Sequence, residues 1–447
     1  MRVEARRALL KGIAGALAPI AVLVLSEVSA SGQTTSDLAR SLDPMFQGLL
    51  ARPGDLANTL QYAAGVAQTD DTESAISTYE QLLFYNPNLA TVRFELGILY
   101  FRLGDYAMAR GYFRTALQMR DITPELRQKT EDYIALMDKK LQPDQVYGFA
   151  QTGLRYQTNA ALGPGPQPVL ASHRLFDSRF FAHGDGNWFG AFGVNYVHDF
   201  ETQDSDTFEA SLVGYDAQQF RLHQFDVGLL EVRAGPRFGI LPDSAGGVSL
   251  KPYAIATGAL LADAPYYGSA GGGLTLHAAI GAVALDPYVE VVQQSFRNSS
   301  LYPLASQMNG TLSTYALQAS APVGPEVSLQ SRVAVAHASA VFGPDSFDSY
   351  AADVWLPWNF SLPGDGRTWT LTPTAGVTDW RYGAPDPTIN PFVTAHVTEW
   401  RVGLGLDIPI WKQIVLGTLL QYRDDVSNIA AFAMRDFSVT AGPTIKF

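Results

Sequence analysis

The chain contains no cysteine among its 447 residues. It therefore has no disulfide framework, no thiolate metal site and no cysteine nucleophile, an absence common in envelope proteins. Charged residues are also scarce, at 17%, and the formal net charge of −12 argues against a nucleic-acid partner, which would require a basic face. With 11% aromatic residues, this composition suits a β-barrel with alternating polar and apolar faces better than a soluble enzyme.

Catalytic motifs are missing as well. The sequence has no HExxH motif and no Gly-x-Ser-x-Gly elbow, and the glycine-rich stretch 268–273 lacks the lysine and helix of a phosphate loop. The adjacent acids Asp424 and Asp425 could form a cation site in an outer loop, although a solvated turn is the favoured interpretation. We therefore predict a protein that is not an enzyme, with no catalytic, cofactor-binding or metal-binding residues.

Long apolar runs are confined to the N-terminus. Residues 1–30 combine a basic start with an uncharged run from Ile13 to Leu25 and the small residues Val28-Ser29-Ala30. This order predicts an export signal peptide. The run is shorter than the ~20 residues that a spanning helix needs, so a retained membrane anchor is the weaker alternative.

Residues 31–142 show helical periodicity. Eight residues occupy the fixed offsets of a repeat that resembles the tetratricopeptide repeat: Leu96, Gly97, Tyr100, Gly104, Tyr106, Ala109, Phe113 and Ala116. One period earlier, Ala75 and Tyr79 take the places of Ala109 and Phe113, which indicates a second, degenerate repeat. Such a short array either binds a peptide or protein segment along a concave face or acts as a rigid spacer.

From residue 143 to residue 447 the apolar pattern has a period of two. Runs of ~10–14 residues are separated by clusters of Gly, Pro, Asn and Asp. Their length favours the tilted strands of a membrane barrel over a soluble sandwich. We expect about fourteen antiparallel strands, near 146–157, 187–200, 206–217, 224–238, 249–261, 266–281, 285–297, 309–320, 325–340, 348–361, 367–380, 396–409, 411–422 and 433–447.

The connections between these strands alternate in length. Even connections such as 321–324, 363–366 and the break at 409–410 are short, whereas odd ones such as 158–186, 298–309 and 383–395 are long. Short periplasmic turns and long outer loops are typical of outer-membrane barrels. The asymmetry is expected if the helical domain is periplasmic and the first strand runs outward, although the even connection 241–248 is longer than this scheme favours.

The final strand alternates strictly and ends on Phe447. We expect it to pair with the first strand, because lipid cannot satisfy an open sheet edge. The spacing of Thr440, Gly442, Ile445 and Phe447 resembles the terminal signal read by the barrel-assembly machinery of Gram-negative bacteria.

Three charged residues fall on the polar side of predicted strands: Arg332, Arg401 and Asp407. They are expected to line the barrel lumen. Either they border a path for a polar cargo or, as the slightly favoured alternative, opposite charges pair to hold the barrel in shape. A barrel of about fourteen strands has an interior wide enough for both.

The order of signal peptide, tetratricopeptide-like domain and barrel resembles the surface lipoprotein assembly modulators of Gram-negative outer membranes. At residue level the resemblance also includes Gly153-x-x-Tyr156-Gln157-Thr158-Asn159-Ala160 at the start of the barrel, where Thr158 replaces the usual Ser. It implies that the helical domain engages cargo in the periplasm and that the barrel helps move it to the cell surface. It brings no catalytic residues.

Two other functions stay open. Exopolysaccharide exporters also join tetratricopeptide helices to a barrel, but they usually carry many repeats, and this chain has room for about two. A structural barrel with a cargo-binding scaffold is the third alternative. The expected partners are the barrel-assembly machinery, outer-membrane lipid and an exported protein or polysaccharide.

Overall fold

The computed structural model describes residues 61–62, 65–66, 72–140, 142–165, 178–202, 205–241, 247–364 and 366–447. The chain divides into two compact units, and the boundary lies between Gln142 and Pro143. The predicted signal peptide, 1–30, lies outside the described residues. Among the residues described, no helix combines the length and apolar character needed to cross a bilayer.

The first unit contains four described helices, α4 (Thr72–Tyr85), α5 (Ala90–Arg102), α6 (Tyr106–Leu117) and α7 (Pro124–Lys140). The turn between α5 and α6 requires Gly104, whose φ of +80° few other residues adopt. The next residue, Asp105, caps α6 by accepting a hydrogen bond of 3.0 Å from the backbone N–H of Met108. This helix–turn–helix is the predicted tetratricopeptide-like repeat.

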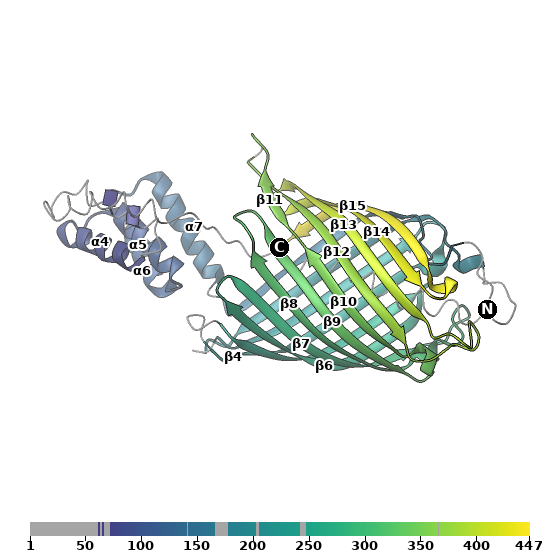
Figure 1. Cartoon of the computed structure of the whole chain (residues 1–447). Coiled ribbons are helices and arrows are strands. Elements are labelled where there is room, and N and C mark those ends of the chain that lie inside the picture. The colour runs from purple at the N-terminus through teal and green to yellow at the C-terminus, as the bar shows by residue number, and fades with distance from the viewer. Residues whose placement is uncertain are drawn as a thin grey trace. The chain divides into compact units, whose positions relative to one another are not determined.

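The second unit is a single antiparallel sheet (Figure 1). Its strands are β1 (Asp144–Gln157), β2 (Asp185–Asp199), β3 (Thr207–Gln219), β4 (Val227–Gly239), β5 (Ser249–Leu261), β6 (Ala264–Ile280), β7 (Val283–Phe296), β8 (Gly310–Pro322), β9 (Ser328–Ala340), β10 (Phe347–Trp355), β11 (Trp358–Ser361), β12 (Thr368–Tyr382), β13 (His396–Trp411), β14 (Ile414–Ser427) and β15 (Met434–Lys446).

The sheet closes on itself because β1 pairs with β15. Strands β10 and β11 both pair with β12 and form one stave of the barrel, interrupted at Pro357, which has no N–H to donate. The barrel therefore has fourteen staves. The predicted fold class, a tetratricopeptide-like helical unit followed by a closed fourteen-strand barrel, is confirmed.

The barrel is apolar on its outer surface. Along β15, Phe437, Val439 and Ile445 are exposed, while the alternating Ser438, Thr440 and Thr444 are buried. Strand β13 shows the same division, with Trp400, Val402 and Leu404 exposed. Exposed apolar and buried polar side chains are the arrangement expected of strands that face lipid.

The connections follow the predicted length asymmetry only in part. We call the end of the barrel at which β1 begins the entry end, and the opposite end the far end. The far-end connection 262–263 has only two residues, both in the left-handed region, and makes a tight hairpin. The entry-end connection 200–206 is longer than predicted, and the connection 240–248 is long, as the sequence already indicated. The predicted break at 409–410 lies inside β13.

Candidate functional site: the helical repeat, the barrel seam and the lumen

The repeat signature forms the core between α5 and α6. Leu96, Ala109, Phe113 and Ala116 have no exposed surface. Gly97 is required because a Cβ at this position would lie 2.6 Å from the ring of Phe113. The signature therefore holds two helices in close contact, and these side chains are not available to bind a ligand.

The aromatic members of the signature join neighbouring helices. Tyr100 on α5 stacks on Tyr112 of α6, with ring centroids 5.4 Å apart, and both hydroxyls donate to Glu80 on α4. Burial and the Glu80 carboxylate raise the pKa of Tyr100 to about 12. Tyr106 packs edge-on against Phe101 at 5.4 Å.

The residues of the predicted degenerate repeat lie in the same core. Ala75 and Tyr79 on α4 are buried and cluster with Leu96 and Leu99 of α5. Burial strongly raises the pKa of the Tyr79 hydroxyl. Helix α4 therefore packs on the repeat as the preceding helix of an array would.

The terminal residues close the seam between β15 and β1 at its entry end. The backbone N–H of Gly148 donates to the carbonyl of Phe447 at 2.9 Å, and the N–H of Phe447 donates back at 3.0 Å. Ile445 and Phe447 project outward and are about half exposed, at 46% and 51%. The aromatic C-terminus is thus part of the last hydrogen-bonded pair of the seam.

Two glycines permit the close approach in the middle of the seam. A Cβ on Gly442 would lie 1.9 Å from the carbonyl oxygen of Thr152 and 2.6 Å from the Cα of Gly153. Thr440 points into the barrel, where its hydroxyl accepts a hydrogen bond of 3.2 Å from Nε of Arg155. Thr440 and Gly442, two residues of the predicted assembly signal, therefore have a structural role in closing the barrel.

The motif from Gly153 to Ala160 fastens the far end of the same seam. The Thr158 hydroxyl donates to Asp436 at 3.1 Å and accepts from the backbone N–H of Phe437 at 2.8 Å. The backbone N–H of Asn159 also donates to Asp436, and its buried side chain donates to the carbonyl of Arg435 at 3.1 Å. Serine at this position would supply the same hydroxyl as Thr158.

Two of the predicted lumenal residues share one acid. Arg332 on β9 lies 3.7 Å from Asp353 on β10, and Arg401 on β13 lies 2.7 Å from the other oxygen of that carboxylate. Arg332 also donates to the hydroxyl of Tyr288 at 3.1 Å. Gly376 lies between β10 and β13 on this face, and its missing side chain leaves room for the Asp353–Arg401 contact.

The contacts continue toward the far end as what we call the lumenal ion-pair chain. Arg401 pairs with Glu399, whose second oxygen lies 2.6 Å from Arg423 on β14. Nε of Arg423 in turn lies 3.0 Å from the fully buried Asp425. Positive and negative groups alternate along the chain, so each buried charge has an opposite neighbour.

The structure corrects the interpretation of Asp424 and Asp425. They lie within β14 rather than in a loop, and they point to opposite faces of the wall. Asp425 pairs with Arg423 in the lumen, and Asp424 lies 3.2 Å from Arg435 on the outer surface. The sequence did not single out Asp353, Glu399 or Arg423. Asp353 and Glu399 fall on the polar side of predicted strands, whereas Arg423 lies just beyond the predicted strand 411–422, because β14 continues to Ser427.

The third predicted lumenal residue, Asp407, is not part of the lumenal ion-pair chain. It is partly buried on β13 opposite Gly417 and forms no ion pair with any residue that the structure describes.

The opposite wall of the barrel carries a second set of ion pairs. Glu209 binds Arg237 at 2.5 Å and Lys251 at 2.6 Å, and Arg233 joins Glu231 and Glu290.

Loops cross the far mouth of the barrel. Phe180, from the connection between β1 and β2, packs against Tyr302, from the connection between β7 and β8, with ring centroids 6.1 Å apart. These connections are six of the fourteen staves apart, on nearly opposite sides of the ring. Tyr302 also packs on Tyr266 at 5.4 Å, and the surrounding cluster includes Ile389 and Ala431 from further far-end loops.

The histidine and acidic side chains of the described residues were compared with the requirements of a metal site. In the described ranges, no group of three or more His, Asp or Glu side chains is arranged to hold a metal ion. Five histidines each lie beside one aspartate instead: His198, His223, His277, His337 and His396.

Comparison with known proteins gives one family match and several barrels. The tetratricopeptide repeat family matches residues 90–121. No curated protein sequence matches the chain. Among solved structures, the chain is similar to the anion-selective porin from Comamonas acidovorans, with 10% identity, a TM-score of 0.35 and coverage of 68% of this chain and 99% of the porin.

Two further structures have comparable scores. The outer membrane channel DcaP of Acinetobacter baumannii shares 11% identity, with a TM-score of 0.37 and coverage of 68% of this chain and 97% of the channel. A bacterial polysaccharide outer membrane secretin shares 9% identity, with a TM-score of 0.31 and coverage of 67% and 98%. The family match is confined to one repeat, and the structural matches have low sequence identity and low TM-scores.

Proposed function

We propose that this protein is a Gram-negative outer-membrane exporter that captures cargo with a periplasmic helical domain and assists its surface display through the barrel. A surface protein, in particular a lipoprotein, is the favoured cargo. The observation that carries the proposal is the closed barrel, whose apolar side chains face outward and whose charged side chains pair inside. Such a wall is stable in lipid. Its expected partners are the barrel-assembly machinery and outer-membrane lipid.

We propose an orientation in which the entry end of the barrel faces the periplasm. Helix α7 ends at Lys140 and β1 begins at Asp144, so the helical unit is tethered to the entry end. With that end in the periplasm, the connection of two residues between β13 and β14 is a periplasmic turn, and the crossing loops lie at the cell surface.

Cargo capture is supported by apolar side chains that the helical unit leaves exposed. Phe84 and Tyr85, at the end of α4, are 83% and 58% exposed, and their rings pack edge-to-face at 5.5 Å. Leu103, Met108 and Leu136 are also exposed. Exposed aromatic pairs of this kind are typical of contact surfaces for other proteins.

The structure of the lumen favours assisted export of a cargo over its free diffusion through the barrel. Paired charges brace both described walls, and loops pack across the far mouth. We propose that cargo passage requires displacement of these loops. A purely structural barrel is the alternative that the same observation favours.

Deletion of the gene, followed by surface proteomics with parallel polysaccharide staining, tests the proposal. The expected result is loss of a protein from the cell surface, with its periplasmic pool retained or increased. Loss of surface polysaccharide alone would favour the exporter alternative. An unchanged surface would support the structural barrel and contradict the proposal.

Variants of the helical unit separate capture from barrel assembly. Phe84→Asp combined with Tyr85→Asp should reproduce the deletion phenotype while the barrel still folds. Gln81→Asp, at an exposed polar site on the same helix, is the matched control and should complement fully.

A further inference from the structure

The seam between β1 and β15 differs in connectivity from the other junctions of the barrel. Each other pair of neighbouring staves is consecutive in the chain, so its own connection closes it at the entry end or at the far end. The seam joins the first strand to the last, and no connection links these two strands at either end. A chain segment that lies between two staves can therefore enter at one end and leave at the other only in the seam.

Hydrogen bonding across the seam is interrupted near its middle. Strand β1 is in register with β2 along its whole length, but with β15 only over 149–151 and 154–157. Gly148 and Phe447 exchange both backbone bonds, so every second residue of β15 before Phe447 faces β1, and Pro443 is one of these. Proline has no N–H, so β1 lacks a donor at this point.

Two other junctions contain a proline in a gap in register, Pro236 between β4 and β5 and Pro287 between β6 and β7. Each of these junctions is closed at the entry end by the connection between its strands, 240–248 or 281–282. Among the described strands, the seam alone combines a missing donor with two open ends.

Side-chain hydrogen bonds hold the far end of the seam closed. The buried carboxylate of Asp436 on β15 accepts a hydrogen bond of 3.2 Å from the side chain of Gln157. It also accepts from the Thr158 hydroxyl and the backbone N–H of Asn159, at 3.1 and 2.9 Å. We call these contacts the Asp436 latch. At the entry end the ladder stops at the C-terminal residue, where strand ends fray most easily, so we expect the seam to open from that end.

The two faces of the seam suit the two parts of an acylated protein. On the outer face, Leu154 and Ile445 are 59% and 46% exposed, whereas on the lumenal face Arg155 donates to Thr440. Each CH₂ of an acyl chain is about 0.8 kcal/mol more stable in lipid than in water. Charged side chains are costly in hydrocarbon. An acylated protein is therefore most stable with its lipid outside the barrel wall and its polypeptide in the lumen.

We propose that the seam is the path by which the acyl anchor of a lipidated cargo crosses the membrane. The polypeptide passes through the lumen, the acyl chains stay in lipid, and the covalent tether between them slides along the seam from the periplasmic end to the outer end. The Asp436 latch releases last. The inference deepens the proposed function and rests on it, because it assigns the lipidated form of the cargo to this one junction.

A disulfide across the seam tests the path, because the chain has no cysteine of its own. Gln151 and Thr444 are in register across the seam, so Gln151→Cys with Thr444→Cys should form a disulfide in the oxidising periplasm. The control, Gln151→Cys with Ala191→Cys, joins β1 to β2 from the same residue of β1. We expect loss of surface display with the seam disulfide, recovery after reduction, and normal display with the control disulfide.

The cargo itself supplies a second control. The probe is the surface protein that the deletion strain loses, used with and without its acylated cysteine. The seam disulfide should block only the lipidated form, and equal loss of both forms would overturn the inference. Normal display of the lipidated form by a fully disulfide-bonded seam would also overturn it and leave the proposed function standing. A deletion strain with an unchanged surface would instead contradict the proposed function, and this inference with it.

Amide exchange, measured by NMR on the reconstituted barrel, tests the opening without cargo. The backbone N–H groups of Val439 and Ala441 point toward β1. Those of Ser438 and Thr440 point toward β14. We expect the first pair to exchange faster, and the difference to shrink when the seam disulfide forms. Asp436→Ala, which removes the latch, should speed exchange at Val439 further. Equal exchange of the two pairs in the wild type would overturn the inference.

Discussion

The helical unit and the barrel place the same kinds of side chain in opposite positions. In the helical unit, Phe113 and Leu96 are fully buried. In the barrel, Phe437 and Trp400 are exposed on the outer surface, and Arg423 and Asp425 are buried. Each arrangement minimises the free energy in its own surroundings, water for one unit and hydrocarbon for the other. The contrast shows that residue type alone does not decide burial, because the solvent decides which face is hidden.

The largest expected effect is failure of the barrel to close at the seam between β15 and β1. Gly442→Val places side-chain atoms where the Thr152 carbonyl and the Gly153 Cα already lie. We expect loss of the folded barrel, measured by heat-modifiable migration in electrophoresis. Gly258→Val adds the same group where a Cβ meets nothing within 4 Å, and it should fold. A folded Gly442→Val barrel would show that this close approach is not required for closure.

The second prediction tests burial of an aromatic residue in each unit. Phe113→Ala removes a ring that packs on Phe94 and Tyr133 at 5.6 and 5.4 Å, and it should lower the free energy of unfolding of the helical unit by about 3–5 kcal/mol. Phe437→Ala removes an exposed ring and should affect the barrel far less. Denaturant titration followed by circular dichroism measures both. Equal losses would contradict the inside-out arrangement.

The third prediction uses two adjacent leucines on β14. Leu420 is 43% exposed on the outer face, and Leu419 points into the barrel. Leu420→Arg should destabilise the barrel by about 2–4 kcal/mol if the site lies near the bilayer centre. Leu419→Arg, placed in the polar lumen, should cost much less. The comparison is made by refolding titration into lipid vesicles, and the reverse order would assign the wrong face to lipid.

The smallest effect concerns the lumenal ion-pair chain. Asp353→Asn leaves Arg332 and Arg401 without their shared acid and should cost about 1–2 kcal/mol, since both arginines keep some exposure to water. Ion conductance of the reconstituted barrel should change little if these ion pairs only stabilise the barrel wall. A large change in ion conductance without loss of stability would favour a transport path instead.

Much of this architecture was predictable because period and spacing are local properties. The repeat signature predicted the α5–α6 pair, and alternation predicted each stave of the barrel to within a few residues. The fate of Asp424 and Asp425 was not predictable in the same way. Two adjacent acids suggest a turn, but here the barrel wall separates them, and Arg423 and Arg435 supply partners from each side.

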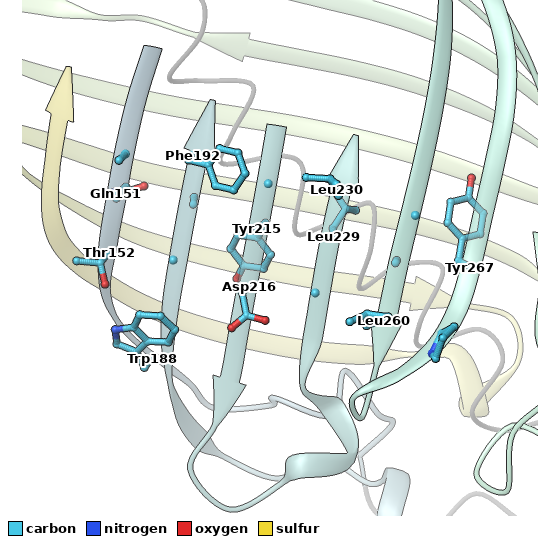
Figure 2. A pocket seen from close by; sticks show the side chains of 18 residues that line it. Gln151, Thr152, Trp188, Phe192, Tyr215, Asp216, Leu229, Leu230, Leu260 and Tyr267 are labelled. Carbon is cyan, nitrogen blue, oxygen red and sulfur yellow. The ribbon is translucent and has the colours of Figure 1, made fainter. Parts of the chain in front are cut away.

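The candidate site was less predictable than the fold. Arg332 and Arg401 were identified as lumenal from alternation, yet their shared partner Asp353 lies on another strand. Register between strands distant in sequence decides such pairs, and no local pattern records it. The hollow in the outer surface over β2 to β5, which is lined by Gly190, Gly228 and Gly258 among others (Figure 2), likewise depends on glycines from several strands that become neighbours only in the sheet.

By itself, the sequence determined the two kinds of structure, the number of staves and the terminal strand that completes the ring. These follow from hydrophobic periodicity, which each segment carries regardless of its neighbours. Only the tertiary structure decided which charges neutralise one another, which loops cross the far mouth and where the outer surface is hollow. Those features depend on contacts between segments far apart in the chain, and closure of the barrel fixes all of them together.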